Sequence, residues 1–211
     1  MKITKIGHCC LLIEAAGKRI LTDPGSYTRV QNEIDKIDII LITHEHADHL
    51  HLESLQIILR HNPQAHIFTN SAVGQILTEN NINFSLLEDK DKVEIDNLLI
   101  EGFGNNHAEI YNDFKLVQNT GFMINQRFFY PGDALYVPPL PVEILALPVV
   151  APWVKIKEAI DYALQVRPRI SFPVHDGMLK ITDGFYKVPE KILLDNGIGF
   201  KPLSLLEAYD F

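Results

Sequence analysis

Four side chains of the types that bind metal ions lie within six consecutive positions: His44, His46, Asp48 and His49. They form the pattern H-x-H-x-D-H, and imidazole with carboxylate suits zinc, manganese or iron. On a helix, two metal-binding histidines are expected four positions apart. His44 and His46 are two apart, so extended or loop backbone can point both the same way, while Asp48 and His49 reach a second ion. A solvated polar loop is the alternative interpretation.

The position of this motif along the chain strengthens the metal interpretation. It follows an apolar run at residues 37–42, which predicts a buried strand, and it precedes a helix predicted over residues 51–61. Ligand sites in open α/β sheets form where strands end. Three later polar loops also follow predicted strands and carry His107, Asp133 and His175. A site for two ions needs ligands from a second side, and these three loops are the natural suppliers.

The rest of the chain alternates strand and helix patterns in both halves. We expect strands at residues 2–6, 11–14, 19–22, 67–69, 84–87, 92–95, 98–102, 120–125, 127–130, 143–147, 169–174 and 201–206. We expect further helices at residues 71–79, with Ser71 as the N-cap, at 155–166 and at 189–196. The order predicts an α+β fold in which two sheets pack together with helices outside. No linker interrupts it, so residues 1–211 are expected to form a single domain.

Bulk composition limits the possible partners. The 211 residues include 19 Lys and Arg against 27 Asp and Glu, a net charge of −8. This balance argues against broad binding to nucleic acids or anionic membranes, so we expect a small-molecule substrate. The N-terminus lacks the apolar core of a signal peptide and no run is long enough to span a bilayer, so we expect a cytoplasmic protein. Adjacent Cys9 and Cys10 are expected to pack in the core rather than form a disulfide.

The ordered set of the H-x-H-x-D-H motif followed by His107, Asp133 and His175 resembles the metallo-β-lactamase-fold hydrolases over nearly the whole chain. Within that family, the Gly7-His8 opening and the segment Leu21-Thr22-Asp23-Pro24 look similar to the branch of ascorbate-6-phosphate lactonase-like proteins. The resemblance implies a four-layer αββα sandwich with its site at one edge, between the sheets.

The resemblance also implies a role for each candidate. One ion would be held by His44, His46 and His107, the other by Asp48, His49 and His175, with Asp133 bridging. Two cations about 3.5–4 Å apart can share a hydroxide nucleophile and polarise the electrophilic oxygen. Zinc is expected first, with manganese or iron as alternatives. The predicted activity is hydrolysis of a small lactone, ester or phosphodiester by a metal-bridged hydroxide, with Asp48 as the catalytic residue that also accepts a proton from the nucleophilic water.

Two polar residues near the N-terminus are further candidates. His8 and Asp23 each follow a predicted strand and could orient a ligand imidazole from behind, or simply cap a loop. Loop residues close to the ligand segments are expected to pack in the core or on the surface rather than line a pocket; these are Tyr136, Trp153 and Lys155. Structural or solvated roles are expected for the remaining histidines, namely His51, His61 and His66.

Other functions remain open at this point. A non-enzymatic metal or ligand sensor would need the same seven residues, and a phosphodiesterase acting on nucleic acid would use the same ions. No G-x-S-x-G motif is present, so a serine nucleophile elbow is not indicated. A Cys–His pair formed with His8 is a minor alternative to metal-dependent hydrolysis.

Overall fold

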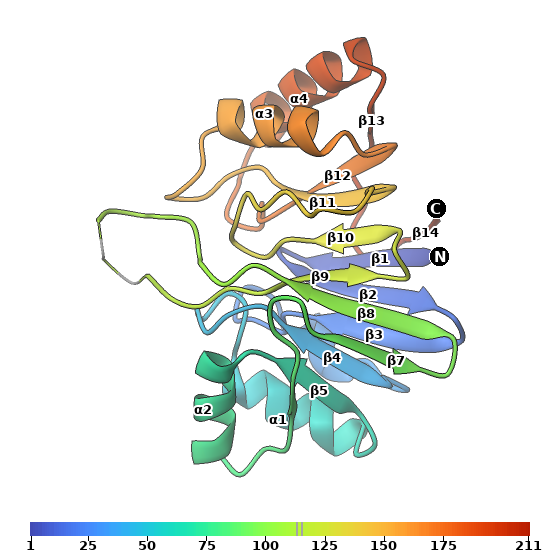
Figure 1. The fold of residues 1–211 in the computed structure, drawn as a ribbon, viewed down its shortest axis with the longest axis vertical. Helices are drawn as coiled ribbons and strands as arrows, with labels where there is room; N and C mark the ends of the chain where they lie inside the picture. The colour runs from blue at the N-terminus through green and yellow to red at the C-terminus, as the bar shows by residue number, and fades with distance from the viewer. Residues whose placement is uncertain (113, 115) are drawn as a thin grey trace.

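The computed structural model describes residues 1–112, 114 and 116–211, and it contains two seven-stranded sheets packed face to face (Figure 1). The first sheet has the order β14-β1-β2-β3-β4-β5-β6. Its strands are β1 Lys2–Gly7, β2 Cys10–Ala15, β3 Lys18–Thr22, β4 Ile39–Ile42, β5 His66–Thr69, β6 Ser85–Leu86 and β14 Ala208–Asp210. The second sheet has the order β13-β12-β11-β10-β9-β8-β7. Its strands are β7 Lys92–Ile95, β8 Leu98–Phe103, β9 Gly121–Ile124, β10 Phe128–Tyr130, β11 Ile144–Pro148, β12 Ile170–Val174 and β13 Gly199–Phe200.

Four α-helices form the outer layers. Helices α1 Leu52–His61 and α2 Ser71–Glu79 cover the first sheet, while α3 Ile156–Val166 and α4 Asp183–Asp195 cover the second (Figure 1). A short 3₁₀ helix, η1 Val30–Glu33, contacts α1. The expected αββα sandwich is therefore the observed fold. None of the described helices is both long and apolar enough to cross a lipid bilayer.

The layers follow from side chains that alternate between the two faces of each strand. In β4, Ile39 and Leu41 join the core between the sheets, whereas Ile40 and Ile42 pack under α1 and α2. Strand β11 alternates in the same way: Ile144 and Ala146 face the central core, and Leu145 and Leu147 face α3. Strands buried on both faces read as continuous apolar runs. Three apolar clusters thus hold four layers together.

Most predicted elements lie where expected, and the hairpin of β9 and β10 is one example. The two strands pair antiparallel, with Phe128 opposite Ile124. Asn125 and Gln126 form the turn, and both adopt positive φ, 50° and 52°. Such left-handed pairs match the twist of the flanking strands. The turn therefore forms where the two predicted strands, 120–125 and 127–130, meet.

Three expectations for local structure were wrong. The N-cap of α2 is Asn70 rather than Ser71, because the Asn70 side chain accepts the backbone N–H of Val73. Helix α4 begins at Asp183 and contains Pro189 in its interior, although the sequence favoured a start at the proline. Tertiary contacts hold this additional turn, since Tyr186 donates a hydrogen bond to Asp176 and its ring lies near that of Phe200.

The third error concerns residues 201–206, which do not form the last strand. This segment passes from β13 in the second sheet to β14 in the first, so it cannot continue either ladder. Pro202 also lacks the N–H that a ladder requires. A single bridge between Lys5 and Leu205 is its only strand-like pairing among the described residues.

Candidate metal centre

The seven predicted metal-binding side chains come together at one edge of the sandwich. The H-x-H-x-D-H motif follows β4, and the other three follow β8, β10 and β12; the residues are His44, His46, Asp48, His49, His107, Asp133 and His175. Strand β4 runs parallel to β3 and β5, and β10 runs parallel to β11 and β12. The carboxyl ends of these strands therefore meet at the same edge, as the position of the motifs after predicted strands indicated.

Five imidazole nitrogens at this edge have no hydrogen-bond partner. They are the buried Nε2 atoms of His44, His46, His49, His107 and His175, and Asp133 Oδ1 is in the same state. Buried polar atoms in proteins are nearly always hydrogen-bonded. Several unpartnered nitrogens that face one another are the expected state of a cluster that binds cations, and this cluster therefore fits metal ions.

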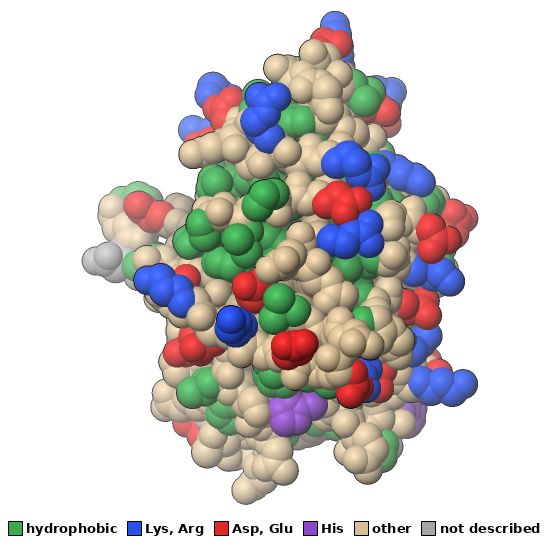
Figure 2. All heavy atoms as spheres, turned by 45° about the vertical axis from the view of Figure 1, so that its right-hand side comes forward, with side chains coloured by type: hydrophobic (Ala, Val, Ile, Leu, Met, Phe, Trp, Pro, Cys, Tyr) green, Lys and Arg blue, Asp and Glu red, His purple; other side chains and the backbone are tan. Residues whose placement is uncertain are grey.

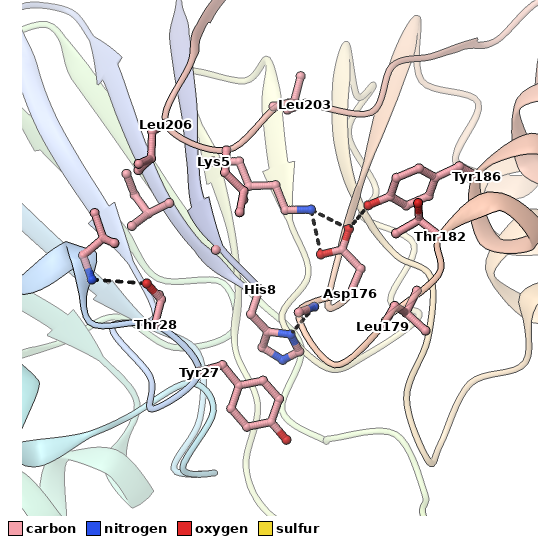
Figure 3. A pocket seen from close by; sticks show the side chains of 15 residues that line it. Lys5, His8, Tyr27, Thr28, Asp176, Leu179, Thr182, Tyr186, Leu203 and Leu206 are labelled. Atoms are coloured by element: carbon pink, nitrogen blue, oxygen red, sulfur yellow. Dashed lines mark hydrogen bonds and ion pairs between the residues drawn. The ribbon is translucent and has the colours of Figure 1, made fainter.

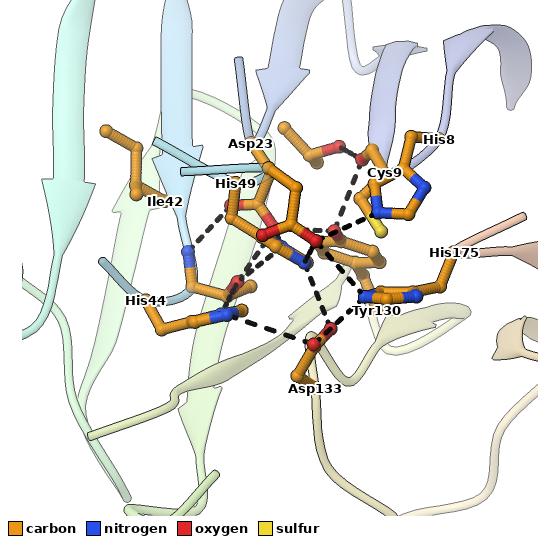
Figure 4. A network of polar contacts seen from close by, with 12 residues as sticks. His8, Cys9, Asp23, Ile42, His44, His49, Tyr130, Asp133 and His175 are labelled. Carbon is orange, nitrogen blue, oxygen red and sulfur yellow. Dashed lines mark hydrogen bonds and ion pairs between the residues drawn. The ribbon is translucent and has the colours of Figure 1, made fainter. Parts of the chain in front are cut away.

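Asp133 lies at the centre of the cluster. Its Oδ2 is 3.0 Å from His175 Nε2, 3.4 Å from His107 Nε2 and 3.9 Å from His44 Nε2. Its Oδ1 is 3.0 Å from His49 Nε2 (Figure 4). Both oxygens thus face imidazoles, so this carboxylate has the geometry of a bridge between two sets of ligands.

The first set consists of His44, His46, His107 and Asp133, whose ligand atoms all lie within 4.8 Å of one another. The rings are fixed from behind. His107 Nδ1 donates to the Ala108 carbonyl at 2.5 Å, which leaves Nε2 with a free lone pair. His44 Nδ1 lies 3.0 Å from the Thr43 hydroxyl. Hydrogen bonds of this kind fix the tautomer that binds a metal.

The second set contains Asp48, His49 and His175. Asp48 Oδ2 is 3.5 Å from His175 Nε2 and 3.9 Å from His49 Nε2. His175 Nδ1 donates to the Val150 carbonyl at 2.7 Å, so its Nε2 also presents a lone pair. The Nδ1 of His49 faces Asp23 Oδ2 at 2.7 Å. Asp23 therefore lies behind a candidate ligand imidazole, which is one of the two roles that the sequence left open.

His8 contacts a carboxylate rather than orienting an imidazole through a hydrogen bond. Its Nδ1 accepts the backbone N–H of Gly177 at 3.1 Å, so Nε2 carries the proton. Nε2 then donates to Asp48 Oδ2 at 3.2 Å. The ring is 4.2 Å from that of His175, centroid to centroid. With both nitrogens engaged, His8 is suited to holding Asp48 in place.

Cys9 has a larger place at the site than the sequence analysis gave it, where a Cys–His pair was only a minor alternative to a core position. Its thiol is buried, as expected for a core residue, but it also lies with His8, His49 and His175 in a second group whose ligand atoms are within 4.8 Å of one another. Burial alone would raise the pKa of Cys9, yet the three histidines lower it to about 6. The adjacent Gly7-His8 turn was the only available signal, because strand alternation placed the thiol in the core.

The site concentrates charge away from water. Burial would raise the pKa of Asp133, but His49 and His175 hold it well below its usual range. Burial would lower the pKa of His49, but nearby acidic groups, chiefly Asp133, raise this pKa well above the ordinary value. The pKa of His44 is lowered by burial and by His49, so its ring stays neutral. A buried carboxylate surrounded by imidazoles is an environment that favours cations.

Trp153 is part of the site, which corrects the expectation that it packs in the core or on the surface. Its indole Nε1 donates to Asp133 Oδ2 at 2.9 Å. Its ring also lines a cavity of about 430 Å³ that opens directly over His46, Asp48 and His175. The indole therefore both holds the central carboxylate and forms a wall where a substrate would bind.

The other expectations for packing agree with the structure. Tyr136 packs against the apolar cluster under α3, and Lys155 is the exposed N-cap residue of α3. His51 caps α1 by accepting the backbone N–H of Ser54. His61 contacts the Asn32 carbonyl, and His66 contacts the Ser85 hydroxyl.

A second cavity, of about 370 Å³, is lined in part by His8 (Figure 3). Its floor is a buried ion pair between Lys5 Nζ and Asp176, with O–N distances of 2.5 and 2.7 Å. Lys5 also donates to the Pro173 carbonyl, and Tyr186 donates to Asp176. Asp176 directly follows His175, so this ion pair anchors the loop that carries a candidate ligand.

Comparison with known proteins agrees with this geometry. The family model described as "Beta-lactamase superfamily domain" matches residues 2–175. Protein Rv0786c of Mycobacterium tuberculosis is 33% identical over 184 residues, which cover 85% of each chain. The UPF0173 metal-dependent hydrolase Ta0764 of Thermoplasma acidophilum is 23% identical over 189 residues, 83% of each chain. Among solved structures, the metallo hydrolase Igni18 of Ignicoccus hospitalis has a TM-score of 0.78 at 20% identity, with 100% of this chain and 98% of that chain covered.

The two packed sheets, the outer helices and the His/Asp cluster at the sheet edge define a protein of the metallo-β-lactamase fold. The chain belongs to the beta-lactamase superfamily. The predicted resemblance to this family and the predicted fold are thereby confirmed.

Proposed function

We propose that this protein is a metal-dependent hydrolase that uses two divalent cations to cleave a small lactone, ester or phosphodiester. Membership of the beta-lactamase superfamily and relatives named as metal-dependent hydrolases support the general class. The substrate class is our extension. The narrower likeness to ascorbate-6-phosphate lactonase-like proteins stays a prediction.

One observation carries the proposal: the unpartnered imidazole nitrogens arranged around Asp133. Seven His and Asp ligands exceed what one tetrahedral zinc ion can use. The first ion would be held by His44, His46 and His107, the second by Asp48, His49 and His175, and Asp133 would bridge. Zinc is the first expectation, with manganese or iron as alternatives, because nitrogen and oxygen ligands select weakly among these metals.

When bound, such ions lower the pKa of a water molecule and polarise the bond to be cleaved. The residues of the chain supply the remaining requirements. Burial would raise the pKa of Asp48, but the neighbouring His175 and His8 side chains lower it, so its Oδ2 is an unprotonated acceptor beside the cavity. Asp48 can therefore take the proton of an attacking water molecule, and His8 keeps its carboxylate oriented.

The surroundings favour a small-molecule substrate. The cavity above the cluster has a volume of about 430 Å³, which is within the usual range for small-molecule sites. On the face shown in Figure 2, acidic and basic side chains are interspersed, without the broad basic surface that nucleic acids need. A cytoplasmic location remains part of the proposal.

The experiment is metal content followed by turnover. Protein purified with metal supplementation should contain two ions per chain by elemental analysis, and chelation should abolish hydrolysis of small esters and lactones until zinc or manganese is restored. Asp48→Ala should fold and lose turnover. One ion or none, or an Asp48→Ala variant with full metal content and unchanged kcat, would contradict this assignment.

Two alternatives are separated by the same preparation. A metal or ligand sensor would bind the ions and turn over none of the esters, lactones or phosphodiesters. The nearness of Cys9 to His49 and His175 favours a cysteine-dependent alternative more than the sequence alone did. Thiol alkylation under denaturing and refolding conditions distinguishes it: activity that survives metal removal but is lost on alkylation identifies cysteine chemistry.

A further inference from the structure

The wall of the cavity above the cluster of candidate metal ligands is apolar. Apart from the candidate ligands, it is formed by an alanine and six larger apolar or aromatic side chains drawn from separate loops: Tyr27, Ala47, Ile110, Phe114, Pro152, Trp153 and Met178. These loops follow β3, β4, β8, β11 and β12, so every side of the opening contributes apolar surface. A substrate group placed there lies against these apolar side chains and the cluster.

No lysine or arginine is among the described residues that line this cavity, and the carboxylates Asp48 and Asp133 are among them. Proteins that bind phosphate or carboxylate groups generally supply Arg, Lys or a helix N-terminus for the additional negative charge. Apart from the cluster, the described wall has no cationic side chain that could pair with an anionic substituent. Nothing in this wall would therefore offset the free energy that the substituent loses when it leaves water.

The rim of the cavity keeps large apolar side chains in contact with water. Tyr27 is 52% exposed, Phe114 is 60% exposed and Met178 is 43% exposed. They come from three different loops and yet surround one opening. Apolar side chains grouped on a protein surface and bordered by polar residues mark places that bind an apolar ligand. Their grouping over the metal cluster points to the substrate itself as that ligand.

We infer that the substrate is a neutral ester or lactone with an apolar chain or ring next to the bond that is cleaved, rather than a phosphodiester or a substrate with an anionic tail. This inference rests on the proposed function and selects among its open substrate classes. In the reaction, the oxygen of water forms a bond to the acyl carbon and the C–O bond of the ester breaks. One proton of the water passes to the leaving oxygen, the other is released from the new carboxyl group, and no oxidant or reductant is required.

The kinetic test uses the metal-loaded protein and a series with one leaving group: the p-nitrophenyl esters of acetate, butyrate, pentanoate and hexanoate. We expect kcat/KM to rise by up to about fourfold for each methylene that the apolar wall buries. The matched charged probe is p-nitrophenyl hemisuccinate, which has nearly the size of the pentanoate ester and carries a carboxylate. It should react at least tenfold more slowly than the pentanoate, and bis(p-nitrophenyl) phosphate should also be a poor substrate. A flat series, or preference for either anionic probe, overturns the inference.

A binding test separates this inference from the proposed function. Trp153 is the only tryptophan of the chain and lines the cavity, so its fluorescence reports occupancy. N-phenylpentanamide, which resembles the ester but reacts slowly, should change this fluorescence and bind at least tenfold more tightly than N-phenylsuccinamic acid. If binding follows this order without any turnover, the hydrolase proposal fails and the preference for apolar groups stands. If esters are turned over but binding does not follow this order, the hydrolase proposal stands and the preference for apolar groups fails.

A charge placed on the rim provides the matched variant. Met178→Lys alters an exposed residue and should fold. It should lower kcat/KM for the hexanoate ester and raise it for the hemisuccinate, so that the ratio of the first value to the second falls by tenfold or more. The control is Leu194→Lys, because Leu194 is similarly exposed at 54% but lies on α4 away from the cavity. Equal ratios in Met178→Lys, Leu194→Lys and the wild type would overturn the inference.

Discussion

Replacing Asp23 by asparagine tests whether a residue behind a candidate ligand controls metal binding. The Asp23 side chain is fully buried and accepts four hydrogen bonds. Oδ1 accepts the backbone N–H of Thr43 at 2.8 Å. Oδ2 accepts the Thr43 hydroxyl at 2.7 Å, His49 Nδ1 at 2.7 Å and the Tyr130 hydroxyl at 2.5 Å (Figure 4). Each oxygen therefore faces donors only.

An asparagine amide cannot satisfy all of these donors. If its NH₂ group faces Thr43, two N–H donors meet, and a buried donor without a partner costs about 1–3 kcal/mol. If its NH₂ group faces His49, the imidazole must accept at Nδ1 and carry its proton on Nε2. In that tautomer His49 no longer offers a lone pair to an ion. Either orientation is costly, and the second directly weakens metal binding.

We expect Asp23→Asn to lower metal affinity by about 10- to 100-fold, the usual effect of changing a group behind a ligand. The lost stability of about 1–3 kcal/mol should lower the Tm of the metal-free protein by roughly 2–12 °C for a chain of this size. Competition with a chromophoric chelator measures the affinity, and thermal unfolding without metal measures the stability. The two readouts separate loss of a ligand lone pair from general destabilisation.

The matched control is Asp38→Asn. Asp38 Oδ2 accepts the backbone N–H of Arg19 at 2.8 Å, before β4 begins and at the opposite end of that strand from the cluster. This variant should change metal affinity by less than about twofold, since no ligand depends on it. An Asp23→Asn protein with wild-type affinity would refute the reasoning, because His49 would then bind its ion without the carboxylate behind it.

Three further variants test other parts of the structure. Lys5→Met leaves the carboxylate of Asp176 buried without its cation, so the free energy of unfolding should fall by about 3–5 kcal/mol in denaturant titrations. Glu143→Gln removes a carboxyl whose pKa is lowered to about 2, chiefly by Arg127. Its stabilisation, below about 1 kcal/mol at this partly exposed site, should be present above the unfolded-state pKa and lost as pH falls towards 2, so variant and wild-type Tm should converge in acid. Gly25→Ala would place a Cβ 1.7 Å from the Asp48 carbonyl oxygen, so the loop that carries Asp48 must move. Elemental analysis should then show reduced metal content.

Each of these variants has a control and an outcome that contradicts it. Lys157→Met removes an exposed pair on α3 and should change stability by no more than about 0.5 kcal/mol; an equal effect from Lys5→Met would contradict the role of the buried pair. A Tm difference for Glu143→Gln that persists unchanged at pH 2 would contradict the sign given above. Gly184→Ala meets nothing within 4 Å, and full metal content in both glycine variants would contradict the close contact.

Much of the fold could be predicted because local patterns and tertiary packing agree. Strand β4 is buried on both faces, and its continuous run of Ile and Leu residues predicts this burial from the sequence alone. The site could be located because its ligands lie at strand ends, which parallel sheets bring to one edge. The structure gathers all seven predicted ligands there, and whether they bind two ions stays a prediction.

The supporting contacts could not be predicted because they join segments far apart in the chain. Trp153 contacts Asp133 because the loop after β11 folds back over the site. The residues next to Trp153 in the sequence do not indicate this path of the loop. The Lys5–Asp176 pair connects positions 171 residues apart. Helix α4 begins before its proline for the same reason, since contacts of Tyr186 outside the helix favour the additional turn.

Backbone conformation at the site shows most directly what the sequence pattern leaves out. His8, Asp23 and His175 adopt φ values of 49°, 37° and 60°, a left-handed region that costs non-glycine residues about 1–3 kcal/mol each. All three directly follow a strand at the edge that carries the cluster, and two are joined by a hydrogen bond from His175 N to the His8 carbonyl. Glycine at any of these positions would relieve the strain and remove the imidazole or carboxylate. The strain is therefore tolerated where a side chain with metal-site chemistry must stand at a sharp turn, which is the kind of conflict between local preference and function that sequence periodicity cannot reveal.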